Sequence, residues 1–133
     1  SPLGGEINAQ TLGGWHMKAF RSEANSSKVA FLSDYDKKLK FIDLATKDEQ
    51  TIDLSGVEGY PVRVATDDTN NAAVVAFAQT GTGTSTFFRV GLDGTITPLQ
   101  ATTRLLPTGL AVSGDGTKIY VGNRKSLDVL PNN

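Results

Sequence analysis

The sequence has 133 residues, of which 38% are hydrophobic and 20% are charged. This length suits one domain, and the apolar content supports a buried core, which excludes a wholly disordered chain. The formal net charge is −1 and the basic residues are scattered, so the sequence lacks the clustered positive charge that is typical of nucleic-acid-binding proteins. The chain contains no cysteine, which excludes disulfides, thiolate metal sites and cysteine nucleophiles. No apolar run reaches the roughly 18 residues that a membrane span needs.

Short apolar runs separated by turn residues dominate the sequence. Fourteen glycines and five prolines punctuate these runs, which are rich in Val, Ile, Phe, Leu and Tyr. The runs have the length of strands and are too short for typical helices. They occupy residues 29–32, 39–44, 72–77, 87–90, 109–112 and 119–121. The pattern predicts an all-β chain without a long helix.

The sequence repeats with a period of 45 or 46 residues. The segments that begin at Trp15, Tyr60 and Leu106 align with one another, and the same register aligns Val29 with Val74. Two anchors therefore support one period, which is a signature of repeat architectures. Trp15 and Tyr60 occupy the same repeat position, and we expect both to pack in the core.

Each repeat unit contains up to four expected strands. They lie at 15–20, 28–33, 38–44 and 49–54 in the first unit, 61–66, 72–78, 85–91 and 94–99 in the second, and 107–112, 117–122 and 125–130 in the third. Four strands in roughly 40 to 45 residues is the size of one propeller blade. A blade packs both faces on its neighbours, which explains why the second strands are apolar almost continuously. The sequence predicts a β-propeller segment of three blades, a half-propeller, with units at 15–59, 60–105 and 106–133.

The third unit is one strand short, and a matching strand is expected at the other end of the chain. Residues 6–12 precede Trp15 by the distance at which residues 51–54 precede Tyr60. We expect this displaced strand to complete a last blade, because one terminus commonly closes the sheet begun by the other.

Three blades are too few for a ring, since propellers typically hold about 4 to 8. We expect either a homodimer that closes a six-bladed ring, which is the favoured interpretation, or packing onto further blades of a longer chain. Without such a partner, both end sheets are expected to expose apolar faces.

The third unit carries a recognisable motif. Residues 106–123 read LPTGLAVSGDGTKIYVGN, and SLDVL follows at 126–130. This string resembles the YVTN repeats of bacterial surface-layer and periplasmic propellers, and NHL and TolB-like propellers have similar repeats. The match weakens in the second unit and further in the first. The resemblance implies a β-propeller in a secreted or periplasmic protein. It concerns fold rather than chemistry, because motif residues such as Gly116 serve turns and packing.

His16 is the only histidine, so a hydrolytic triad would have to use it and a multi-histidine metal site is excluded within one chain. It lies at the start of the innermost strand of the first unit, with Lys18 on the same side. Arg63 occupies the position matching Lys18 in the next unit. These cationic groups either converge to hold an anionic ligand, or extend into solvent or pair with acidic neighbours.

The remaining candidates are expected to be structural. Asp34 with Asp36, and Asp67 with Asp68, are interpreted as solvated turn residues because neither pair fits a calcium loop. The glycine-rich stretch 81–85 lacks the ending of a phosphate-binding loop and is interpreted as a flexible loop. The sequence therefore predicts neither a metal site nor a cofactor.

The leading functional hypothesis is a non-enzymatic propeller module that presents its loop faces to a protein or polymer ligand. It depends on the repeat and on the scarcity of catalytic residue types. The alternative is a lyase or hydrolase at the mouth of the channel, with His16 as acid or base and Arg63 holding an anionic substrate. A third possibility is a purely structural set of blades within a larger surface protein.

Overall fold

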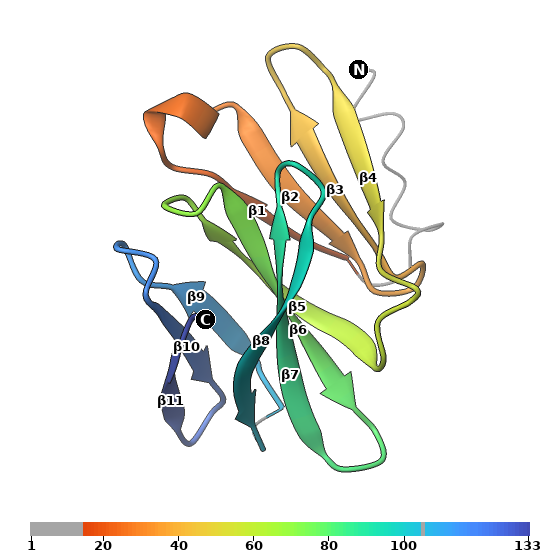
Figure 1. Cartoon of the computed structure of the whole chain (residues 1–133), viewed down its shortest axis with the longest axis vertical. Helices are drawn as coiled ribbons and strands as arrows, with labels where there is room; N and C mark the ends of the chain where they lie inside the picture. The colour runs from red at the N-terminus through yellow and green to blue at the C-terminus, as the bar shows by residue number, and fades with distance from the viewer. Residues whose placement is uncertain (1–14, 105) are drawn as a thin grey trace.

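The structure is a computed structural model that describes residues 15–104 and 106–133. Its strands form three antiparallel sheets in chain order (Figure 1). The first sheet contains β1 (Trp15–Ala19), β2 (Lys28–Ser33), β3 (Lys38–Asp43) and β4 (Glu49–Asp53). The second contains β5 (Tyr60–Asp67), β6 (Ala72–Gln79), β7 (Thr84–Gly91) and β8 (Ile96–Thr103). The third contains β9 (Gly109–Val112), β10 (Lys118–Gly122) and β11 (Leu127–Pro131), and one short 3-10 turn, η1 (Glu23–Asn25), follows β1.

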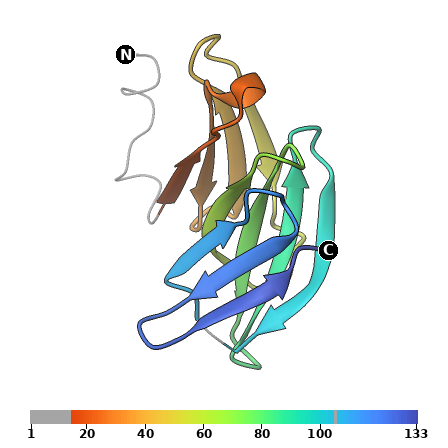
Figure 2. The ribbon, with the colours of Figure 1, turned by 90° about the vertical axis from the view of Figure 1, so that its left-hand side faces the viewer.

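The prediction of an all-β chain is confirmed, and the described strands divide into four, four and three as expected. Consecutive strands are neighbours within each sheet, and Figure 2 shows the three sheets following one another through the molecule. The described strands do not make a closed ring (Figures 1 and 2). The displaced strand expected at residues 6–12 lies outside the described residues.

Some predicted strand boundaries were wrong. The fourth strand of the second unit was expected at 94–99, but β8 begins at Ile96 and continues to Thr103. The reason is a turn in which the Gly91 N–H donates to the Thr95 carbonyl at 2.8 Å, with Gly94 at φ 91°. Among the smaller differences, β9 and β11 each begin two residues later than expected, and Thr84 and Ser85 belong to β7 rather than to the glycine-rich loop.

Strand β6 supplies the centre of the core from both of its faces. Ala73, Val75 and Phe77 pack in a cluster with residues of the first sheet. Val74 and Ala76 alternate with them and pack against the third sheet. All five side chains have 0% exposure. This confirms the interpretation that the continuous apolar run of the second strand reflects burial between two sheets.

Neighbouring sheets are joined by hydrogen bonds between residues one repeat apart. Bonds of this kind link positions separated by 45 to 47 residues, close to the sequence period. They include the bonds that join Asn25 to Asn71, Thr66 to Ala19, Thr69 to Gly114 and Asn70 to Gly116. Equivalent positions of successive units therefore meet in space, as expected when each sheet is rotated onto the next.

The interpretation of Asp67 as a solvated turn residue was wrong, because its side chain is buried with 1% exposure. Its carboxylate accepts hydrogen bonds from Asn70 Nδ2 at 2.7 Å and from Asn132 Nδ2 at 2.8 Å. Arg89 Nε lies 3.8 Å from the same carboxylate, and Arg89 Nη2 donates to Asn132 Oδ1 at 2.8 Å. Asn132 Nδ2 also donates to the Gly116 carbonyl at 2.9 Å. This network ties the second sheet to the third.

The outward side of the third sheet is apolar and exposed. Leu127 and Val129 of β11 are 63% and 54% exposed, and Val129 is paired with Tyr120 of β10. Among the described strands, β11 has β10 as its one sheet neighbour, so its other edge has no strand partner there. The expected exposed apolar face is therefore present at this end. The first sheet differs in part: on the face where β2 carries Val29 and Phe31, these two side chains are buried, whereas Met17 of β1, the partner of Phe31, is 51% exposed.

Candidate functional site

The first strands of the three sheets, β1, β5 and β9, lie next to one another and enclose a cavity of about 280 Å³. The structure brings His16, Lys18 and Arg63 together at this cavity. It is also lined by Met17, Val64, Thr108, Gly109 and Leu110. The geometric part of the sequence hypothesis, that these cationic residues converge, agrees with the structure. Their role in binding stays a prediction.

A β-bulge positions Arg63. The pairing of β5 with β6 shifts register between Pro61 and Arg63, and such bulges re-aim the side chains beside them. Arg63 Nη1 donates to the Val62 carbonyl at 2.6 Å, and its Nε donates to the Thr108 carbonyl at 3.4 Å. The guanidinium group is therefore held between the second and third sheets at the wall of the cavity.

The pKa of His16 is lowered from its ordinary value of 6.5. Burial of the imidazole is the largest cause, and the positive charges of Arg63 and Lys18 add to it. Asp34 acts in the opposite direction but does not outweigh these effects. His16 is consequently neutral near pH 7. The burial of its ring and the positive charges of Arg63 and Lys18 disfavour a proton on it.

The part of the cavity wall that comes from the third unit was not predicted from the sequence. Thr108, Gly109 and Leu110 line the cavity and carry no charge. The repeat itself could have found them, because Gly109 follows Arg63 by one period of 46 residues. At the repeat position where the first two units carry Lys18 and Arg63, the third unit therefore has Gly109, which has no charge.

A second cavity of about 480 Å³ continues along the same strands. Lys18 and Leu110 line both cavities, so the two are adjacent. Arg21 and Asp68 lie at the second one, where the Asp68 carboxylate accepts the backbone N–H of Arg21 at 3.0 Å. The same carboxylate oxygen also accepts the backbone N–H of Ser22 at 3.1 Å, so two backbone donors of the segment after β1 hold it. Together the cavities form a groove, the inner-strand groove, along β1, β5 and β9.

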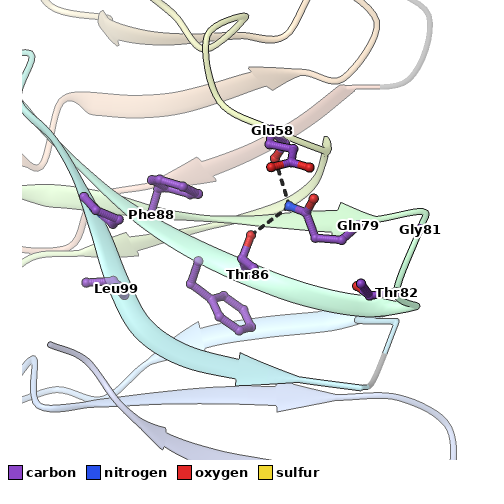
Figure 3. A pocket seen from close by; sticks show the side chains of 9 residues that line it. Glu58, Gln79, Gly81, Thr82, Thr86, Phe88 and Leu99 are labelled. Carbon is purple, nitrogen blue, oxygen red and sulfur yellow. Dashed lines mark hydrogen bonds between the residues drawn. The ribbon is translucent and has the colours of Figure 1, made fainter.

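A third cavity, of about 450 Å³, lies on the second sheet (Figure 3). Gln79 Nε2 bridges its wall by donating to the Glu58 carbonyl at 2.8 Å and to Thr86 Oγ1 at 3.0 Å. Phe88 and Leu99 make it apolar on the other side (Figure 3). It has no cationic lining residue, so its chemistry differs from that of the inner-strand groove.

The other predicted candidates do not form a site. Tyr60 was expected in the core, but its side chain is 59% exposed at the start of β5; the side chain of Trp15 lies outside the described residues. Within residues 15–104 and 106–133, no three His, Asp or Glu side chains gather in a way that could hold a metal ion. The same residues include no helix with the length and apolar character of a membrane span.

Comparisons with known proteins bear on the fold. No protein-family model matches the chain, and no curated protein matches it. A chain in the crystal structure of a mitotic checkpoint complex is similar to it, with a TM-score of 0.59 and 15% sequence identity. The fold is propeller-like. The similarity covers 88% of this chain but 38% of the other, so this chain corresponds to a minor part of the larger one.

Proposed function

We propose that this chain is a non-enzymatic binding module of the β-propeller type, which presents its inner-strand groove and the adjoining loops to a protein or polymer ligand. The observation that carries the proposal is the meeting of His16, Lys18 and Arg63 at one cavity. A triad needs an acid that orients the histidine, and no hydrogen bond to the His16 ring is found within the described part of the chain. By its resemblance to YVTN propellers, the module works outside the cytoplasm, in the periplasm or on the cell surface.

The proposal includes an assembly step. A three-sheet arc leaves the third sheet with an exposed apolar face and an edge lacking a strand partner among the described residues, and such surfaces favour association. We propose that a second copy covers Leu127 and Val129 and gives residues 6–12 to the edge of β11, closing a six-bladed ring. Further sheets of a longer chain are the other possible occupant.

Replacing Val129 by Asp tests this assembly. Val129 is 54% exposed, so the substitution leaves the fold intact, but it places a charge in the proposed interface. We expect the mass in solution, measured by light scattering, to fall from dimer to monomer at micromolar concentration. Tyr60→Asp adds the same charge at an exposed aromatic residue of the central sheet and should leave the dimer intact. Equal masses for the Val129→Asp variant and the unmodified chain would count against this interface.

One observation favours the enzymatic alternative. The lowered pKa of His16 leaves a neutral imidazole beside the Arg63 guanidinium, which is the arrangement of a general base next to an anion-holding group. The variant His16→Ala separates the two functions for any ligand of the groove. A binding module forms no product with either chain, whatever the change in its affinity. An enzyme that uses His16 loses roughly 10²-fold or more of its rate while the fold is unchanged.

A further inference from the structure

The inner-strand groove has an unbalanced charge. Arg63, Lys18 and His16 line one cavity, and its β9 wall contributes no acidic side chain. The ion pairs found among residues 15–104 and 106–133 are Lys40–Glu49 and Arg89–Asp67, which lie elsewhere. The cations at the cavity are therefore not neutralised by a protein carboxylate in direct contact, and a bound anion would relieve their repulsion.

Two backbone carbonyls at the wall of the cavity hold the Arg63 side chain. Its Nη1 and Nε groups donate to the carbonyls of Val62 and Thr108, while no hydrogen bond from Nη2 is found within the described part of the chain. A guanidinium fixed by two backbone carbonyls loses little freedom when its remaining N–H groups bind an oxygen ligand. The fork of N–H donors matches a carboxylate, sulfate or phosphate group.

We propose that the cavity between β1, β5 and β9 is an oxyanion site, in which Arg63 and Lys18 hold the anionic group and His16 takes up a proton when it binds. The volume of about 280 Å³ admits one such group with a short extension, and the adjacent cavity has room for the rest of a longer acidic ligand. This proposal rests on the proposed function in one respect, that the inner-strand groove is the ligand-binding face.

The sign of the pH dependence follows from the charges around His16. In the free protein, burial together with Arg63 and Lys18 lowers the pKa of His16, and Asp34 alone raises it. β9 adds no charge to this balance, because residues 108–112 contain none. An oxyanion in the cavity adds negative charge and raises the pKa again. By linkage, the anion binds more tightly at low pH, over the interval between the pKa values of the free and bound states.

The single histidine makes the test direct. The His16 imidazole resonances are followed by NMR between pH 4.5 and 8.5 in chloride, and then in sulfate or acetate at the same ionic strength. We expect sulfate, acetate or both to raise the pKa of His16 by about one unit, which corresponds to a tenfold preference for the protonated protein. No difference from chloride in either salt would overturn the proposal.

Matched variants assign the effect to the cavity. In Arg63→Gln, we expect the pKa of His16 in chloride to rise and the effect of sulfate or acetate to disappear. Arg124→Gln, in the exposed loop between β10 and β11, should behave as the unmodified chain. If Arg63→Gln fails to fold, Lys18→Gln takes its place, with a reduced anion effect expected. An anion effect of equal size in every folded variant would overturn the proposal.

Light scattering of the same samples gives their mass, which distinguishes a failure of the oxyanion site from a failure of the proposed ring. A dimer whose His16 shows no anion effect contradicts the oxyanion site but not the ring. A monomer with the full effect supports the site, because residues of one chain build it, and contradicts the ring.

Discussion

Replacing Asp67 by Ala is expected to lower the free energy of unfolding by about 3 kcal/mol, because it removes the acceptor at the centre of a buried network. Asn70 Nδ2 and Asn132 Nδ2 donate to this carboxylate, and Arg89 lies against it. Without it, Asn70 Nδ2 and Asn132 Nδ2 keep only the Gly116 carbonyl as acceptor, and Arg89 loses the negative charge that faces it. Urea unfolding followed by circular dichroism measures the loss.

Two further variants show whether the network causes this effect. Asp67→Asn keeps the shape and one acceptor oxygen, so we expect an intermediate loss of about 1 to 2 kcal/mol. Asp36→Ala removes an exposed carboxylate from the turn after β2 and should change the stability by less than about 0.5 kcal/mol. A loss in Asp67→Ala no larger than in Asp36→Ala would show that the network does not hold the third sheet in place.

Replacing Phe77 by Ala is expected to cost about 4 kcal/mol. Its side chain has 0% exposure in the core between the first and second sheets, and its ring meets that of Phe88 edge-on with centroids 5.3 Å apart. Truncation leaves a cavity at a point where neither sheet can collapse without breaking its strand pairing. The same unfolding measurement applies.

Two control variants show whether the loss of stability in Phe77→Ala comes from the burial of this side chain or from the removal of any aromatic ring. Phe77→Leu retains most of the volume and should cost about 1 kcal/mol. Tyr60→Ala removes an aromatic ring that is 59% exposed and should cost less than about 0.5 kcal/mol. Equal losses for Phe77→Ala and Tyr60→Ala would contradict the two-faced burial of β6.

The sequence was sufficient for features that depend on local pattern and on the repeat. The uninterrupted apolar run of β6 predicted a strand covered on both faces, and the repeat gave Lys18 and Arg63 equivalent positions, which agrees with the cavity that they share. The sequence could not show that Asp67 is buried, because the residues that follow it in the chain have the composition of a polar turn. The partner that buries it, Asn132, lies 65 residues away.

The exposed position of Tyr60 has a similar explanation. Its place in the repeat predicted core packing, but a repeat position fixes the orientation of a side chain, and its burial depends on what lies opposite. The later start of β8 likewise depends on a turn at Gly94, which adopts a positive φ. Local sequence therefore predicted which units form, and long-range contacts decided which polar and aromatic side chains those units bury.

The mass of the unmodified chain in solution tests the central claim most directly, since the proposed ring closes only when a second copy adds its sheets. Light scattering of the purified chain should give about 28 kDa, twice its mass of 14.1 kDa. A stable monomer of 14.1 kDa at high concentration would contradict the ring that two copies are proposed to form.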